Sequence, residues 1–162
     1  MLQGALIGVG NIALKGHLPA YCQDETLEKE ITIAAVADLS PTNLEKVKEL
    51  LPMARLYSSA ADLFRHEELD FIDICSPPHT RREIIKAALD QGCHIVCEKP
   101  LATSVAEGKE TADKIRSAKV VFVPCHQYRY SAIWKSIKEI IEKKELGDIL
   151  LENGVITRER LD

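Results

Sequence analysis

The chain has 162 residues, of which 46% are hydrophobic and 28% are charged, and its formal net charge is −4. This length supports one domain with a substantial core, and a mildly acidic chain without a lysine- or arginine-rich block is unsuited to sequence-independent nucleic-acid binding. No apolar run approaches the roughly 20 residues that a membrane helix needs. The apolar N-terminus lacks the basic region and cleavage site of a signal peptide, so we expect a cytoplasmic protein with no membrane or nucleic-acid partner.

Five cysteines, an odd number, together with the lack of a signal peptide, indicate a reducing compartment. Cys93 and Cys97 fall in a predicted strand, where they share a face but lie roughly 13 Å apart. That separation is too large for one metal ion. We therefore predict no metal site and interpret the cysteines as small buried hydrophobic residues.

Short apolar runs alternate with helical patterns along the first 125 residues. The predicted strands are Leu2–Val9, Ile31–Ala37, 55–57, Phe71–Cys75, His94–Cys97 and Val120–Val123. The predicted helices cover 11–21 with a kink or end at Pro19, a segment capped by Ser40, one capped by Ser58 or Ser59, one from Thr80 to about Gln91 and one from Thr103 or Ser104 to about Ser117. Gln23–Glu30 is expected to be a loop or a helix end. This alternation predicts a doubly wound α/β fold with a parallel sheet.

The pattern changes after residue 126, so we divide the chain into 1–125 and 126–162. The second part begins with a predicted helix through Ile133, Ile137 and Ile141, followed by a break at Gly147 and an apolar strand, Ile149–Ile156. That strand has no evident partner and is expected to be the first of a domain that is missing or supplied by another chain. An unpaired apolar edge predicts a homodimer through residues 149–157.

The segment Gly8–Ala13 (GVGNIA) fits the pattern G-x-G-x-x-A directly after a strand and before a helix. Gly8 permits a tight turn, Gly10 allows the backbone to approach a pyrophosphate, and the helix N-terminus faces the anion. Asp38, at the end of the second strand, can bind ribose hydroxyls and repel a 2′-phosphate, which favours NAD over NADP. The spacing of 30 residues from Gly8 to Asp38 exceeds the usual ~20. A glycine turn with a solvated aspartate is the alternative.

Two further segments follow strands, at the edge where an open parallel sheet binds ligands. After the fifth strand, Lys99 in Glu98-Lys99-Pro100 could donate a proton beside a nicotinamide, and its bond to Pro100 could be cis. A solvated loop lysine is the alternative. After the fourth strand, Ser76-Pro77-Pro78 forms a rigid loop that could lie against the cofactor. The neighbouring His79 is a minor candidate, because a lone loop histidine is more often simply exposed.

Three other residues could have either a ligand role or a structural one. Arg129 could clamp a carboxylate or anchor the following helix. His17 and Trp134 are interpreted as packing or capping residues.

These motifs occur in an order and spacing that resembles the glucose–fructose oxidoreductase, inositol dehydrogenase and MocA family. They are GVGNIA with HLPA (8–13 and 17–20), VAD (36–38), CSPP (75–78), GCHIVCEKPLA (92–102), HQYRY (126–130) and LGDI (146–149). The resemblance covers nearly the whole chain but only the N-terminal half of the family. It departs from the family at Arg81, where many members carry histidine.

The resemblance implies an NAD(P)-binding Rossmann fold and hydride transfer to or from a secondary alcohol of a sugar, inositol or related compound. It places Lys99 near the reacting carbon as the catalytic residue. The implied cofactor-binding residues are Gly8, Gly10, Asn11, Ile12, Asp38, Ser76, Pro77, Pro78, His79, Glu98, Lys99, Gln127 and Arg129. Substrate contacts and the oligomer interface would come largely from the missing second domain. One alternative is a non-catalytic dinucleotide sensor or regulatory module. Another is a Rossmann domain that binds S-adenosylmethionine, although the Glu98-Lys99-Pro100 segment argues against it.

Overall fold

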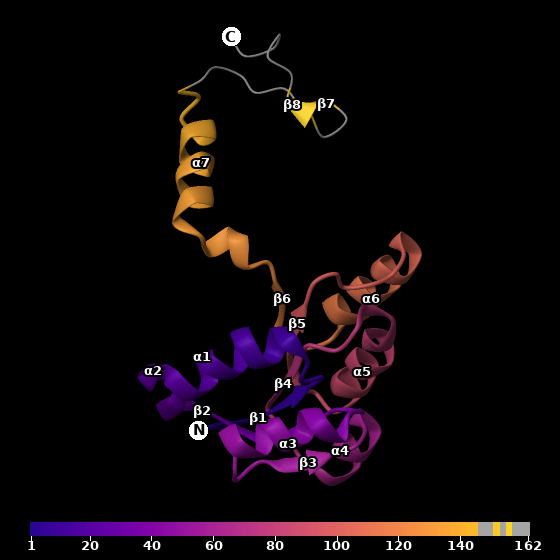
Figure 1. Ribbon diagram of the computed structural model, residues 1–162. Coiled ribbons are helices and arrows are strands. Elements are labelled where there is room, and N and C mark those ends of the chain that lie inside the picture. Colours follow the sequence, from indigo (N-terminus) through magenta and orange to yellow (C-terminus); the bar gives the residue numbers. More distant parts are fainter. Residues whose placement is uncertain (146–150, 153–154, 157–162) are drawn as a thin grey trace. The chain divides into compact units, whose positions relative to one another are not determined.

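The computed structural model describes residues 1–145, 151–152 and 155–156. The chain divides into two compact units, Met1–Cys125 and His126–Asp162. In the first unit six parallel strands form one sheet in the order β3-β2-β1-β4-β5-β6 (Figure 1). The strands are β1 (Leu2–Ile7), β2 (Ile31–Ala37), β3 (Arg55–Tyr57), β4 (Phe71–Ile74), β5 (His94–Glu98) and β6 (Phe122–Cys125). The predicted parallel α/β sheet is therefore confirmed.

Helices cover both faces of this sheet, as the alternation of side chains along β1 requires. Ala5 and Ile7 pack on one face with residues of α4, α5 and α6, whereas Leu6 packs on the other with residues of α1 and α3. The helices of the first unit are α1 (Leu18–Gln23), α2 (Glu25–Glu30), α3 (Pro41–Leu50), α4 (Ala60–His66), α5 (Pro78–Asp90) and α6 (Val105–Ser117). The fold is thus doubly wound.

Serine caps explain where three of these helices begin. The side chains of Ser40, Ser59 and Ser104 each accept the backbone N–H three residues ahead. The predicted cap at Thr80 is wrong, because α5 starts two residues earlier, at Pro78, whose missing N–H costs nothing at the first helical position. Thr80 instead donates to the Pro77 carbonyl at 2.8 Å.

The first helical region also differs from the prediction. The chain does not stop at Pro19: a π-helical segment, Ala13–His17, leads directly into α1, and the Leu18 N–H donates to the Ala13 carbonyl five residues back. The expected loop over Gln23–Glu30 is the short helix α2, because the Asp24 carboxylate accepts two backbone N–H groups at its start.

The second unit contains a 3₁₀ turn, Gln127–Tyr130, and helix α7 (Ala132–Glu142). The prediction of one strand over Ile149–Ile156 is wrong where the structure describes it: β7 (Leu151–Glu152) pairs antiparallel with β8 (Val155–Ile156). The remainder of that range lies outside the described residues, so dimerisation through 149–157 stays a prediction. Within the described part of the chain, no helix is long and apolar enough to cross a lipid bilayer.

Candidate functional site

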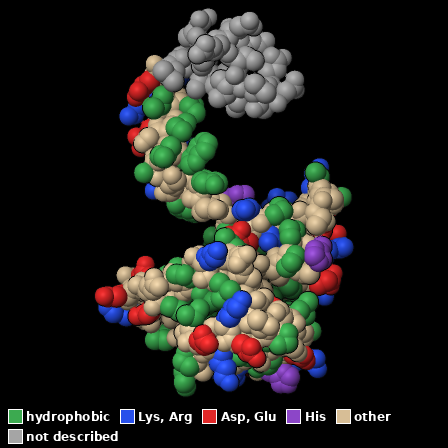
Figure 2. All heavy atoms as spheres, in the orientation of Figure 1, with side chains coloured by type: hydrophobic (Ala, Val, Ile, Leu, Met, Phe, Trp, Pro, Cys, Tyr) green, Lys and Arg blue, Asp and Glu red, His purple; other side chains and the backbone are tan. Residues whose placement is uncertain are grey.

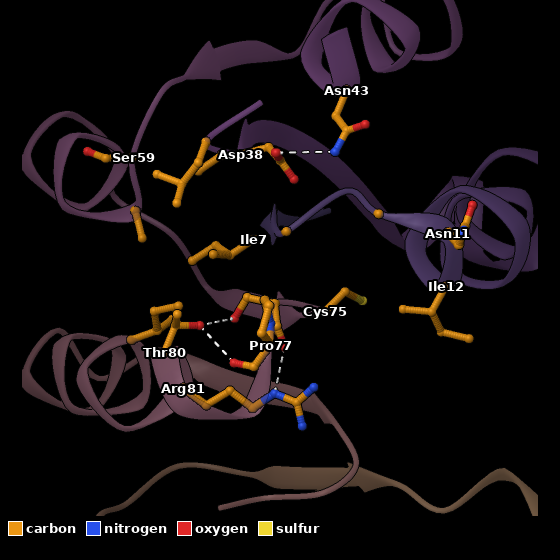
Figure 3. A pocket seen from close by; sticks show the side chains of 17 residues that line it. Ile7, Asn11, Ile12, Asp38, Asn43, Ser59, Cys75, Pro77, Thr80 and Arg81 are labelled. Atoms are coloured by element: carbon orange, nitrogen blue, oxygen red, sulfur yellow. Dashed lines mark hydrogen bonds between the residues drawn. The ribbon is translucent and has the colours of Figure 1, made fainter. Parts of the chain in front are cut away.

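A cavity of about 650 Å³ opens at the carboxyl ends of β1, β2 and β4 (Figure 3). It lies where the strand order reverses direction around β1, which is the point at which open α/β sheets bind their ligands. Its volume falls in the range of small-molecule pockets. Its lining includes Gly8, Gly10, Asn11 and Ile12 of the first turn, Asp38 after β2, Asn43 of α3, and Ser76, Pro77 and Arg81 around the start of α5.

The two glycines of the first turn have different structural reasons to be glycine. Gly8 has a φ of +87°, and a Cβ there would lie 2.6 Å from the Ser76 backbone nitrogen. At Gly10 a Cβ would meet nothing within 4 Å. The fold therefore requires Gly8, whereas Gly10 leaves open space beside the exposed Asn11 and Ile12 at a helix N-terminus. The ligand role of these residues stays a prediction.

The Asp38 carboxylate joins the glycine turn to the end of β2. One of its oxygens accepts the Val9 N–H at 2.6 Å, and the other accepts the Ser40 N–H at 2.7 Å and the Asn43 amide at 3.3 Å. A carboxylate has about four acceptor positions, and these three hydrogen bonds occupy three of them. The binding of a ribose hydroxyl by Asp38 stays a prediction. Asn43 was missed from the sequence. Its position in the first turn after the Ser40 cap, five residues from Asp38, is the signal that could have found it.

The loop after β4 contributes Ser76 and Pro77 to the cavity. Thr80 holds this loop by donating to the Ser76 hydroxyl at 2.9 Å. Pro78 and His79 begin α5 and are not among the lining residues, and His79 is exposed. Their predicted cofactor contacts remain untested.

Glu98 is the last residue of β5 and Lys99 follows it, but neither residue lines this cavity. Glu98 is buried, whereas Lys99 is exposed and joined to Pro100 by a cis peptide bond. Gln127 and Arg129 belong to the second unit, where both are exposed in the 3₁₀ turn. The structure therefore brings only part of the predicted set together around the cavity.

Arg81 is a buried residue that connects two of these loops. Its Nε donates to the Ser76 carbonyl at 2.8 Å, and its Nη1 donates to the carbonyls of Glu98 and Pro100. From the sequence, Arg81 stands out only as a departure from the family pattern. The available signal was its helical spacing with the buried residues Ile84, Ile85 and Ala88, which places a guanidinium on the core side of α5.

A second group of polar side chains was also missed. His17, interpreted as a packing residue, lies 2.6 Å from Asp73 and 3.3 Å from Glu98, and the Tyr21 hydroxyl donates to the same Asp73 oxygen at 2.8 Å. Asp73 is fully buried in β4. A carboxylate inside an otherwise apolar strand, FIDIC, needs a partner, and this was the signal in the sequence.

These contacts and the burial of the side chains shift the pKa values of His17, Tyr21 and Cys75. The hydrogen bond that His17 donates to the Asp73 carboxylate raises the pKa of His17 despite its partial burial. Burial raises the pKa of the Tyr21 hydroxyl and of the Cys75 thiol well above their usual ranges. At neutral pH the two neutral side chains act as hydrogen-bond donors to Asp73, with the thiol at 3.7 Å.

Among the described residues, the same side chains belong to the two groups that could bind a metal ion. His17 groups with Asp73 and Cys75 and, through its other side, with Glu98 and Cys125, the ligand atoms of each group lying within 4.8 Å of one another. Cys93 and Cys97 belong to neither group. Because both imidazole nitrogens already face carboxylate oxygens and the thiols are held neutral, we interpret the cluster as a hydrogen-bonded network and assign no metal to it.

A model of the oxidoreductase family with an NAD-binding Rossmann fold (Gfo/Idh/MocA) matches residues 2–126. The chain belongs to this family. D-glucoside 3-dehydrogenase of Escherichia coli is 28% identical over 148 residues, which are 91% of this chain and 41% of that protein. The chain thus spans about two-fifths of the length of such relatives.

Solved structures give the same result. The chain is similar to myo-inositol 2-dehydrogenase from Lactobacillus plantarum, with a TM-score of 0.83, 26% identity and coverage of 92% of this chain and 43% of that one. It is also similar to the WlbA dehydrogenase of Chromobacterium violaceum in complex with NADH and UDP-GlcNAcA, with a TM-score of 0.82 and 26% identity, covering 91% and 41% of the two chains. The predicted family and NAD-binding Rossmann fold are confirmed, and the S-adenosylmethionine alternative loses its support.

The two glycines give a matched pair of substitutions. Gly8→Ala should lower the free energy of unfolding by about 2–4 kcal/mol, because it combines positive φ with a backbone clash. Gly10→Ala should change it by less than about 1 kcal/mol, because the new Cβ meets open space. Urea denaturation measures both values. Equal losses in the two variants would contradict the described turn.

His17 should make stability depend on pH. Since its folded-state pKa is raised, the stabilisation is fully present below about pH 6.5, the ordinary histidine value, and is lost as the pH rises through the folded-state pKa. The measurement is the difference in unfolding free energy between the parent and His17→Gln over a pH series. A difference that stays constant from mildly acidic to mildly alkaline pH would refute the linkage.

Proposed function

We propose that the chain binds NAD(H) in the cavity at the carboxyl ends of β1, β2 and β4. We further propose that it forms the nucleotide-binding part of an oxidoreductase acting on a secondary alcohol of a sugar, inositol or related polyol. The observation that carries this is the combination of an open Gly10 turn and the adjacent Asp38 carboxylate, which both line one cavity, in a chain that belongs to an NAD-binding family.

The proposed orientation follows from the chemistry of the lining. The N–H groups at Asn11 and Ile12 face a pyrophosphate, and Asp38 accepts hydrogen bonds from the adenosine ribose. The Ser76–Pro78 loop, with His79 beside it, then lies along the rest of the cofactor, and Glu98 and Lys99 lie toward the nicotinamide. When bound, the nicotinamide supplies the carbon that accepts or gives up hydride.

Lys99 is the proposed acid or base for the alcohol oxygen. Its exposed ammonium can donate a proton to a carbonyl oxygen or, once deprotonated, accept one from a hydroxyl. Gln127 and Arg129 are proposed to lead from the Rossmann unit toward the substrate.

We propose NAD as the preferred cofactor over NADP. The fixed Asp38 carboxylate would repel a 2′-phosphate, and no arginine occurs among Leu39, Ser40 and Pro41 to neutralise one. The Asn43 amide beside Asp38 is neutral and offers no compensating charge.

Catalysis by the whole protein is proposed to need polypeptide beyond this sequence, because the relatives are more than twice as long. Helix α7 offers a surface for this polypeptide, because its apolar side chains Ile133, Trp134, Ile137 and Ile141 are exposed. Figure 2 shows hydrophobic side chains gathered along this helix. We propose that substrate contacts come from that second part and that the protein is a homo-oligomer.

A non-catalytic dinucleotide sensor is the second candidate. The observation that favours it is that Lys99 is exposed and outside the cavity, whereas Asp38 lies inside it. A sensor would bind NADH without using Lys99, so reduction of a sugar ketone by the full-length protein and its Lys99→Met variant separates the two functions.

Titration with NADH and NADPH, followed by nicotinamide fluorescence, tests the cofactor site. We expect the parent to bind NADH about tenfold more tightly than NADPH, and Asp38→Asn to reduce this preference because it removes one negative charge. Asp90→Asn, which removes an exposed carboxylate at the far end of α5, is the control and should leave the preference unchanged. Equal affinities for the two cofactors in the parent would contradict the role of Asp38.

A further inference from the structure

His17 lies between two buried carboxylates that come from neighbouring strands. Its Nδ1 is 2.6 Å from Asp73 Oδ2 in β4, and its Nε2 is 3.3 Å from Glu98 Oε1 at the end of β5. Asp73 is fully buried, and Glu98 is 6% exposed. The imidazole therefore bridges the carboxyl-terminal parts of β4 and β5.

This geometry determines the protonation state of the ring. A carboxylate oxygen can only accept a hydrogen bond, so each imidazole nitrogen must donate, and a neutral imidazole has only one N–H. The bridge is complete only with the imidazolium. The short contact to Asp73 is typical of such a charge-assisted hydrogen bond.

The other titratable groups around the ring do not replace this charge. The Tyr21 hydroxyl of α1 and the Cys75 thiol, directly after β4, both donate to Asp73, and the Cys125 thiol of β6 lies near His17 and Glu98. Burial holds the pKa of Cys125 at about 11, so this thiol is neutral. The guanidinium of Arg81 contacts Glu98 only at its main-chain carbonyl.

Glu98 is in turn held at three points. His17 contacts Oε1, the Lys99 backbone N–H donates to Oε2 at 3.1 Å, and Arg81 binds the main-chain carbonyl. A displacement of the Glu98 carboxylate would therefore move the Lys99 amide directly. Side-chain and main-chain contacts together fix the turn from which Lys99 projects.

We propose that His17 is a positioning residue: as an imidazolium it clamps Asp73 to Glu98 and thereby holds the main chain of Lys99 at the nicotinamide side of the cavity. This rests on the proposed function, because the position of Lys99 matters to a cofactor only if NAD(H) binds as proposed. Neither His17 nor Asp73 contacts the cofactor in this arrangement. Both act through Glu98.

Tyr21 provides a matched control for the clamp. Tyr21→Phe removes a hydrogen bond to the same Asp73 oxygen but leaves the contact between His17 and Glu98 intact. His17→Gln also removes a hydrogen bond to this network, yet its neutral side chain cannot bridge both carboxylates with charge. A purely structural role would make the two variants behave alike.

The first experiment is NADH titration of the parent and both variants over a pH series. At pH 6 we expect His17→Gln to bind NADH about tenfold more weakly than the parent, the equivalent of one charge-assisted hydrogen bond. The parent should lose a similar factor as the pH rises and His17 deprotonates, whereas His17→Gln should show no such step. Tyr21→Phe should keep the parent's affinity within about twofold, together with its pH step.

The second experiment measures the clamp without any cofactor. Nitrogen-15 NMR of the imidazole should show His17 doubly protonated at pH 7, and Glu98→Gln should lower its pKa because an uncharged amide replaces the carboxylate. A singly protonated His17 at pH 7 would overturn the proposal, as would equal weakening of NADH binding by His17→Gln and Tyr21→Phe. Failure of the parent to bind NADH at any pH would instead overturn the proposed function, and the imidazole signals would still decide whether the clamp exists.

Discussion

The close approach of the first turn to the loop after β4 is the constraint on which the site depends. The backbone at Gly8 lies so near Ser76 that no Cβ fits between them, and the Gly8 N–H also donates to the Ala37 carbonyl at 2.8 Å. This contact brings the ends of β1, β2 and β4 together at one point. The cavity is lined by residues from these three strand ends and from the helices that follow them.

Three polar side chains each connect two of the segments at this edge of the sheet. Asp38 ties the glycine turn to the end of β2, Arg81 ties the loop after β4 to the turn after β5, and His17 ties β4 to β5. No buried side-chain nitrogen or oxygen of the described residues lacks a hydrogen-bond partner. Such satisfied networks are rigid and hold loops in one arrangement. A rigid edge suits a cofactor that must be held in one orientation for hydride transfer.

The sequence predicted the sheet, because alternating apolar runs and helical patterns depend on local periodicity. It also predicted Gly8 and Asp38, whose positions follow from a short motif directly after a strand. The contacts of His17 and Arg81 could not be predicted in this way. Asp73 and Glu98 lie 56 and 81 residues from His17, Glu98 lies 17 residues from Arg81, and these contacts form only when the strands are side by side. The start of α5 was misplaced because a threonine pattern was preferred to the proline that begins the helix.

In the proposed function, one cavity receives a dinucleotide with its pyrophosphate on the glycine turn and its nicotinamide toward β5. This arrangement can be tested by mapping NADH-induced changes in the amide signals of the nitrogen-15-labelled chain. We expect perturbed amides at Gly10, Asn11 and Ile12, at Ser40 beside Asp38, and at Lys99. Perturbations at Gly10 and Ser40 without Lys99 would contradict the proposed orientation, and perturbations that avoid the glycine turn altogether would contradict the site.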